Sequence, residues 1–382
     1  MSTPTVDHVQ AALADVNDPE IKKPITELGM VKSVDVADNG HVTVEVYLTV
    51  AGCPMKDTIT RDVTAAVSRL DGVADVSVEL DVMSDEQRKE LQQNLRGGQQ
   101  TKEIPFARAD SLTKIYAIAS GKGGVGKSSV TVNLAVSMAQ QGLKVGVVDA
   151  DIYGHSVPAM LGVADLRPTQ VEDMILPVPV HGLQVISVGM LKPRRDQVVA
   201  WRGPMLDRAL VQMLSDVYWG DLDVLLLDLP PGTGDMAISL GQHLVNSEVV
   251  VVTTPQQAAA EVAERAGTMA SMMHQRVAGI IENMSFLPCP HCGPEHRLEI
   301  FGSGGGDQVA QTLSQRFGYD VPVLARVPID ERLRAGGDTG HPLVLQDADS
   351  PAGQALVETA SRLTSRGRGL AGMHLGLTPA GR

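Results

Sequence analysis

The chain has 382 residues, of which 43% are hydrophobic, 20% charged and 3% aromatic. This length suggests two globular domains, and three cysteines are too few for a disulfide-stapled scaffold. The formal charge of -13 argues against sequence-independent binding to nucleic acid or to an anionic membrane, because both depend on a basic surface. No apolar run reaches the ~18 residues of a spanning helix, and residues 1–18 lack a signal-peptide pattern, so we expect a cytoplasmic protein.

Residues 1–90 have the pattern of a small, acidic α/β domain. Residues 1–95 hold 17 acidic and 8 basic side chains, so most of the net charge lies there. A Gln- and Gly-rich stretch at 92–102 has no apolar periodicity, and residues 91–112 are therefore expected to form a linker with a helical start. The expected helices cover 5–14 and 55–70, and the expected strands cover 31–36, 41–49 and 73–80.

Residues 113–366 are expected to form a second α/β domain. Short Val/Ile/Leu runs alternate there with helix-length segments, which is typical of a mostly parallel, doubly wound sheet covered on both faces. Residues 367–382 are interrupted by glycines and contain no acidic residue, so we expect a flexible tail. The expected strands lie at 115–119, 144–148, 183–188, 224–227, 249–252, 277–281 and 321–324.

A glycine-rich loop follows the first of these strands and begins a helix, as a Walker A phosphate loop requires. Glycines let backbone N–H groups reach phosphate oxygens, Lys127 neutralises phosphate charge, and the Ser128 hydroxyl is placed to bind Mg²⁺. A tight turn without a ligand is the weaker alternative, because the whole motif is present. No guanine-binding Asn-Lys-x-Asp sequence occurs, so we expect ATP. The loop consists of Gly121, Lys122, Gly123, Gly124, Val125, Gly126, Lys127, Ser128 and Ser129.

Polar side chains follow three further strands, at the edge where open α/β sheets bind ligands. We assign Asp228 to the Mg²⁺ shell and Asp151 to positioning or activating the attacking water, with turn capping as the alternative role for Asp149. The Gly232-Thr233-Gly234 loop is expected to sense the γ-phosphate. Asn283 is a candidate for pairing with adenine, and a turn-capping role explains it nearly as well.

Cys289 and Cys292 have the spacing of two ligands of one metal centre. They cannot complete a four-thiolate site alone, so a symmetric homodimer with a pair from each subunit is the natural way to reach four. The result would be a bridging iron-sulfur cluster or a zinc ion. A zinc knuckle with His291 or His296 as added ligands within one chain is also possible, and spacing alone places zinc slightly ahead.

Together these motifs resemble the Mrp/ApbC family of iron-sulfur cluster carriers, relatives of the deviant Walker A ATPases MinD and ParA. The resemblance implies a dimer in which Lys122 reaches the partner's nucleotide, and in which Cys289 and Cys292 of both subunits hold a [4Fe-4S] cluster. It therefore favours the cluster over zinc. His155 departs from the family, which usually has proline there. The match lies at 121–129, 149–154, 201–205, 228–235, 253–256, 282–285, 289, 292 and 301–302.

The first domain is similar to the MIP18-type domain that accompanies iron-sulfur assembly proteins. The match lies in Asp18-Pro19-Glu20, in residues 25–31 and in residues 48–54. Cys53 falls in the last of these and precedes the expected helix, whose dipole favours a thiolate that could bind metal or transfer it. A small buried hydrophobic side chain is the equal alternative for Cys53.

We therefore expect an ATP-hydrolysing carrier that takes a [4Fe-4S] cluster from an assembly scaffold, holds it at a homodimer interface and transfers it to apo iron-sulfur proteins. The alternative is a MinD/ParA-like positioning ATPase with a structural zinc knuckle. That class needs a basic face or an amphipathic basic tail, which the charge of -13 and the tail at 367–382 disfavour. A reductase like the nitrogenase iron protein is a third possibility, but its two ligands per subunit are expected to be well separated.

Overall fold

The computed structural model describes residues 4–50, 55–95, 103–108, 110–192 and 203–365. Cys53, the first two residues of the family match at 201–205, residues 96–102 and 109 of the expected linker, and the tail at 367–382 lie outside the described residues. The chain folds into two compact units. Unit 1 comprises Met1–Lys102, Leu166–Pro179 and Asp216–Gly220, and unit 2 comprises Glu103–Asp165, Val180–Ser215 and Asp221–Arg382.

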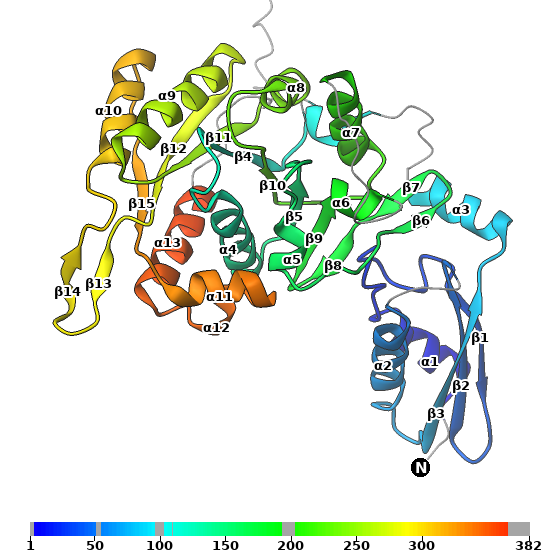
Figure 1. Ribbon diagram of the computed structural model, residues 1–382. Coiled ribbons are helices and arrows are strands. Elements are labelled where there is room, and N and C mark those ends of the chain that lie inside the picture. The colour runs from blue at the N-terminus through cyan, green and yellow to red at the C-terminus, as the bar shows by residue number, and fades with distance from the viewer. Residues whose placement is uncertain (1–3, 51–54, 96–102, 109, 193–202, 366–382) are drawn as a thin grey trace, which may run out of the picture. The chain divides into compact units, whose positions relative to one another are not determined.

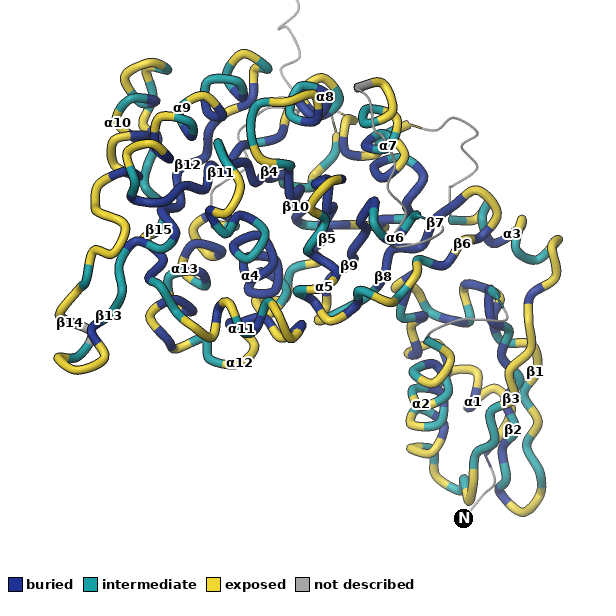
Figure 2. The backbone as a smooth tube through the Cα atoms, viewed as in Figure 1, coloured by how far each residue is buried: buried dark blue, intermediate teal, exposed yellow. Residues whose placement is uncertain are grey.

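The largest sheet has eight strands in the order β15-β12-β11-β4-β10-β5-β9-β8. Neighbouring strands from β15 to β9 run parallel, which confirms the predicted mostly parallel sheet. Figure 2 shows the centre of this sheet as buried, as the Val/Ile/Leu runs require. The strands are β4 (Lys114–Ser120), β5 (Val145–Asp149), β8 (Val178–Val180), β9 (Leu183–Ser187), β10 (Val224–Asp228), β11 (Glu248–Thr253), β12 (Arg276–Asn283) and β15 (Val323–Val327).

Helices cover both faces of this sheet, as Figure 1 shows. α4, α5, α11, α12 and α13 lie on one side, and α7, α8, α9 and α10 lie on the other. The arrangement is the predicted doubly wound one. The helices are α4 (Lys127–Gln140), α5 (Val157–Met160), α6 (Val188–Leu191), α7 (Gly203–Ser215), α8 (Asp235–His243), α9 (Gln257–Met272), α10 (Gly305–Phe317), α11 (Glu331–Thr339), α12 (Leu343–Gln346) and α13 (Pro351–Ser365), with a 3₁₀ turn, η1, at Pro105–Ala107.

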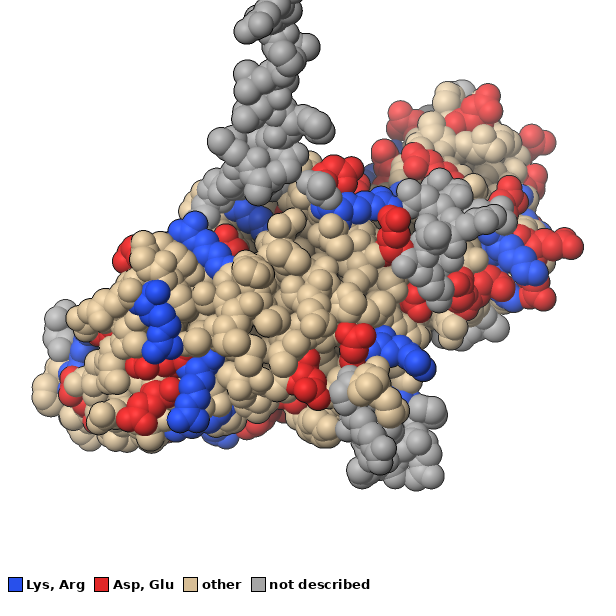
Figure 3. All heavy atoms as spheres, turned by 90° about the horizontal axis from the view of Figure 1, so that it is seen from above, with Lys and Arg blue, Asp and Glu red and all other residues tan. Residues whose placement is uncertain are grey.

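The side formed by α7 to α10 has a mixed surface. In Figure 3, basic and acidic side chains are interspersed around a broad uncharged area. Exposed apolar side chains on these elements are Met205 of α7, Met272 of α9 and Val245, which follows α8. Among the described residues, no helix is long and apolar enough to cross a bilayer.

Unit 1 contains a three-stranded sheet against which α1 and α2 pack. β2 lies in the middle, antiparallel to β1 and parallel to β3. Val42, Val44 and Val46 of β2 are fully buried, so the alternation seen in the sequence faces the core as predicted. α3 continues into the expected linker. The elements are α1 (Val6–Leu13), β1 (Val31–Val36), β2 (His41–Leu48), α2 (Lys56–Val67), β3 (Asp75–Val82) and α3 (Asp85–Leu95).

A hairpin from the middle of the chain completes the core of unit 1. β6 (Thr169–Val171) and β7 (Met174–Leu176) pair antiparallel. Their side chains Val171, Met174 and Leu176 belong to the same buried cluster as the apolar residues of α1, α2 and β2. The Thr169 hydroxyl donates to a carboxylate oxygen of Glu20 at 2.7 Å, and both residues are buried. The compact unit is therefore larger than the domain of residues 1–90 expected from the pattern.

Thr169→Val tests this junction because it keeps the shape of the side chain and removes the donor to Glu20. A buried carboxylate that loses one partner costs about 1–3 kcal/mol, so the free energy of unfolding of unit 1 should fall by that amount. Trp219 lies in unit 1 and is buried, and in a Trp201→Phe background its fluorescence reports the urea transition of this unit alone. Thr169→Ser keeps the hydroxyl and should remain close to the parent chain. Equal stability of Thr169→Val and its parent would contradict a stabilising role for this bond.

Candidate functional site

The phosphate loop joins the central strand β4 to the start of α4. Gly124 and Gly126 have φ angles of +80° and +78°, a backbone region that favours glycine. A Cβ atom at Gly121 would collide with the backbone of α9 at Val262. The glycines thus allow the left-handed turns of the loop and its close approach to α9, and the loop leads directly into the first turn of α4.

Lys127 and Asp228 form a buried ion pair at the base of this loop. The Nζ atom of Lys127 lies 2.7 Å from Oδ1 of Asp228, and the two side chains are 6% and 0% exposed. The Thr131 hydroxyl also donates to Oδ1, at 2.7 Å, and the Ser128 hydroxyl donates to Oδ2, at 2.5 Å. The structure therefore brings together the three residues that the sequence assigned to phosphate charge and Mg²⁺. A hydroxyl oxygen and a carboxylate oxygen in contact are suitable ligands for Mg²⁺.

Asp149 lies beside Asp228 on the neighbouring strand. Its carboxylate accepts the Ser187 hydroxyl at 3.1 Å and the backbone N–H groups of Asp151 and Val157 at 3.2 and 3.3 Å. Complete burial, followed by the charge of Asp228, raises the pKa of Asp149. These contacts agree with the turn-capping role for Asp149.

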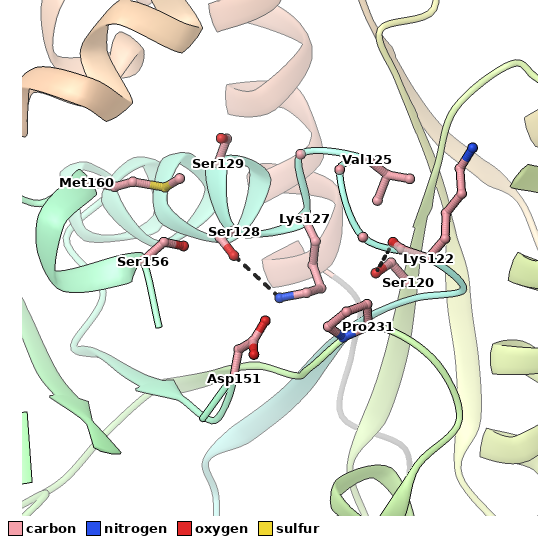
Figure 4. Close-up of a pocket in the computed structure, with 13 residues that line it drawn as sticks. Ser120, Lys122, Val125, Lys127, Ser128, Ser129, Asp151, Ser156, Met160 and Pro231 are labelled. Atoms are coloured by element: carbon pink, nitrogen blue, oxygen red, sulfur yellow. Dashed lines mark hydrogen bonds between the residues drawn. The ribbon is translucent and has the colours of Figure 1, made fainter. Parts of the chain in front are cut away.

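A pocket of about 200 Å³ opens over the loop. Figure 4 shows the Lys127 amine and the Asp151 carboxylate directed into the same space. Asp151 is held there by the N–H of Gly154, which donates to its carboxylate at 2.9 Å. Gly121, Asp228 and Asn283 are not among the lining residues. These are Ser120, Lys122, Gly123, Gly124, Val125, Gly126, Lys127, Ser128, Ser129, Asp151, Ser156, Met160 and Pro231.

Lys122 behaves differently from Lys127. Its side chain extends away from Lys127 and Asp151 in Figure 4. The amine donates to the side-chain carbonyl of Gln256 at 3.0 Å, just before α9 begins. The amine of Lys122 therefore does not face the space that Lys127 and Asp151 share.

Asn283 is hydrogen-bonded to the phosphate loop. Its side-chain amide is buried and donates to the carbonyl of Val125 at 2.9 Å. The neighbouring Glu282 accepts the Ser285 hydroxyl at 2.5 Å and the N–H of Gly306 at 2.6 Å. The end of β12 is thus fastened both to the loop and to the start of α10. The expected pairing of Asn283 with adenine remains a prediction.

The two cysteines lie on a hairpin formed by β13 (Leu287–Cys289) and β14 (Gly293–Leu298). Cys289 is buried and Cys292 is exposed, and the N–H of Cys292 donates to Sγ of Cys289 at 3.4 Å. A ring nitrogen of His296 and the two sulfur atoms all lie within 4.8 Å of one another. A hydrogen bond from His296, followed by the backbone N–H groups of Cys292 and His291, lowers the pKa of Cys289 to about 6. The hairpin thus gathers three metal-ligating side chains, with His296 as the third.

Sequence reasoning did not single out Thr131, and it placed Gln256 in the family match at 253–256 without predicting its contact with Lys122. Thr131 is one helical turn after Lys127, so the i, i+4 rule could have placed its hydroxyl beside the Lys127 side chain. Gln256 meets Lys122 only through the packing of α9 against the loop. No periodicity in the sequence signals that contact.

Two family models and several known proteins match this chain. Residues 111–364 match the family model described as NUBPL iron-transfer P-loop NTPase, and residues 7–80 match the model described as iron-sulfur cluster assembly protein. The iron-sulfur cluster carrier protein of Mycobacterium tuberculosis strain H37Rv is 58% identical over 374 residues, which cover 98% of this chain and 97% of that protein. The protein of the same name from Synechocystis is 39% identical over 367 residues, with 95% and 98% covered.

One similar solved structure is a nucleotide-binding protein from Archaeoglobus fulgidus in complex with ADP. It superposes with a TM-score of 0.54 at 34% sequence identity and covers 66% of this chain and 96% of that one. The resemblance inferred from the motifs is confirmed by relatives that span nearly the whole chain. The chain belongs to the family of iron-sulfur cluster carriers built on a NUBPL-type iron-transfer P-loop NTPase, with an iron-sulfur cluster assembly domain at its N-terminus.

Proposed function

We propose that this protein is a cytoplasmic ATPase that holds a [4Fe-4S] cluster between two copies of the chain and delivers it to apo iron-sulfur proteins. An assembly scaffold supplies the cluster, which is cargo rather than a resident cofactor. One observation carries the proposal: a complete phosphate loop and a pair of thiols lie in the same domain, and β12 contacts the first and leads to the second.

ATP hydrolysis is assigned to the pocket above the loop. The N–H groups at the start of α4 and the amine of Lys127 bind the phosphate oxygens. Ser128 and Asp228, whose side chains are hydrogen-bonded, are the proposed ligands of Mg²⁺, which would neutralise phosphate charge. Asp151 orients the water that attacks the γ-phosphorus and accepts its proton. The bond to the β-phosphate oxygen then breaks and leaves ADP and phosphate, with the Gly232-Thr233-Gly234 loop as the sensor.

Lys122 is proposed to act on the nucleotide of the partner copy. Its amine points away from Lys127 and contacts the neutral amide of Gln256, a contact that it can exchange for a phosphate oxygen. A cation supplied across an interface stabilises the negative charge that develops as the phosphoryl group leaves. This role requires a homodimer with the two phosphate loops facing each other.

Cys289 and Cys292 are the proposed cluster ligands. The lowered pKa of Cys289 supports the thiolate, which is the form that binds metal, near neutral pH. A [4Fe-4S] cluster takes four thiolates and one chain offers two on this hairpin. Two copies complete the set and place the cluster on their common axis.

β12 offers a short connection between the two sites. Asn283 at its end is bonded to the phosphate loop, and the chain runs directly from there into the hairpin of Cys289. A shift of the loop on nucleotide exchange would therefore act on the base of the hairpin. A coupling of about 1–3 kcal/mol between nucleotide and cluster binding is expected for such linked sites.

Asn283→Ala should weaken the binding of ATP and of inorganic tripolyphosphate by the same factor, about tenfold, because the loop loses a buried hydrogen bond. Isothermal titration calorimetry with both ligands measures this. Asn39→Ala, in an exposed turn of unit 1, is the control and should bind as the parent chain does. A loss confined to ATP would instead assign Asn283 to the adenine base.

Lys127→Ala should abolish ATP hydrolysis and weaken ATP binding, because Lys127 belongs to the ground-state cradle. Lys122→Ala should lower kcat by about a thousandfold while the Kd for ATP changes little, as for other cations supplied across an interface. Phosphate release and ATP titration are measured on each variant, with the exposed Lys144→Ala as control. Parental hydrolysis in Lys122→Ala would rule out the contribution in trans.

Anaerobic reconstitution should yield about four irons and four sulfides per dimer, with broad visible absorption. Cys289→Ser or Cys292→Ser should remove the cluster and spare ATP binding, because the nucleotide ligands lie on other loops. Cys53→Ser is the matched control and should keep the cluster, since Cys53 is not needed to complete the ligand set. Stoichiometric zinc after anaerobic purification, with no iron uptake on reconstitution, would contradict the proposal.

A further inference from the structure

We propose that one chain by itself binds a single thiophilic divalent cation, of which Zn²⁺ is the type, through the sulfur atoms of Cys289 and Cys292 and a ring nitrogen of His296. The site stands on the geometry of the hairpin alone. Only its consequence for cluster loading rests on the function proposed above.

The donor atoms are close to the spacing that a tetrahedral ion needs. They lie within 4.8 Å of one another. Zinc bonds of about 2.3 Å to sulfur and 2.0–2.1 Å to nitrogen place tetrahedral donors about 3.5–3.8 Å apart, so the group needs to contract by about 1 Å at most. Cys289 is fixed in β13, whereas Cys292 and His296 are exposed and free of core packing. The contraction therefore requires only movements of exposed side chains.

The backbone geometry of the hairpin brings these donor atoms close together. The strand register shifts between Pro288 and Cys289, so that Cys289 pairs with Gly293. Gly293 has a φ angle of +89°, which closes the turn and lets the N–H of Cys292 donate to Sγ of Cys289. An N–H group directed at a sulfur atom stabilises its thiolate form. His296 then reaches the same sulfur atom from β14.

The chemistry of the donor set selects the ion. Two thiolates and an imidazole are soft or intermediate ligands that favour Zn²⁺ and Co²⁺ over Mg²⁺ or Ca²⁺. Binding forms two metal–sulfur bonds and one metal–nitrogen bond, and any protons still on the two thiols pass to the buffer while His296 binds as neutral imidazole. Three protein ligands leave the fourth tetrahedral position for water or an incoming thiolate.

The single ion and the cluster exclude each other, because both require Cys289 and Cys292. If the chain carries a cluster in the dimer as proposed, the ion occupies the thiols of a chain without cargo. Cluster loading must then displace the ion, and free Zn²⁺ competes with loading. His296 would be a ligand in the ion-bound chain and not in the cluster-bound dimer.

Titration of Co²⁺ into the full-length, metal-free chain under anaerobic conditions tests the site. The expected result is one Co²⁺ per chain, with sulfur-to-cobalt charge transfer and the intense visible bands of tetrahedral cobalt. His296→Ala should weaken binding at least tenfold and shift those bands, and His296→Cys should restore tight tetrahedral binding with a third thiolate. His291→Ala, in the same turn but outside the donor group, is the matched control and should change the affinity less than twofold.

Equal Co²⁺ affinity in His296→Ala and the parent chain, or one Co²⁺ per two chains, would overturn this inference. ADP binding at the parental affinity establishes that each variant is folded. His296→Ala should still take up about four irons per dimer, and loss of the cluster in this variant would overturn the assignment of His296 to the single ion alone. A parent chain that binds Co²⁺ as expected but takes up no iron and sulfide would contradict the proposed function and leave this site in place.

Discussion

The buried pair of Lys127 and Asp228 is the constraint on which the nucleotide domain depends. Removing two charges from water costs several kcal/mol for each, and the cost is offset only by close contact and additional hydrogen bonds. Thr131 and Ser128 supply those bonds from the first turns of α4. The loop, the helix and β10 must therefore be in register before the charges can be buried. The Lys127 amine is thus held almost fully buried against one carboxylate.

The parallel sheet brings residues from distant parts of the sequence together at this site. β10 and β5 end at the same edge, so Asp228 and Asp149 lie side by side although they are far apart in the sequence. Two adjacent carboxylates repel each other, and these two differ in their contacts. Asp228 contacts Lys127, while burial and the charge of Asp228 raise the pKa of Asp149, which accepts backbone and hydroxyl donors as a turn cap. Asp151, two residues further on, lines the pocket itself.

The elements that could be predicted from the sequence are those marked by a regular or uninterrupted residue pattern. Continuous Val/Ile/Leu runs identified seven strands of the large sheet, all except the three-residue β8 (Val178–Val180), and the glycine spacing identified the loop, because both patterns follow from local geometry. The β6–β7 and β13–β14 hairpins were not predicted, for a physical reason. β6, β7 and β13 have only three residues each, too few for a period to emerge, and Pro288 and Pro290 weaken the strand signal around Cys289. The contacts of Asn283 with Val125 and of Glu20 with Thr169 join distant segments and depend on packing alone.

The discontinuity of unit 1 also affects how the chain acquires its structure as it is made. Its last segment, Asp216–Gly220, is translated only after more than half of the chain. At about 5–20 residues per second, the interval between residue 102 and residue 220 is of the order of ten seconds. During that time the apolar faces of α1, α2 and β2 lack the covering side chains Val171, Met174 and Leu176 or the neighbouring Tyr218. Unit 1 is thus completed only after the phosphate loop has been synthesised.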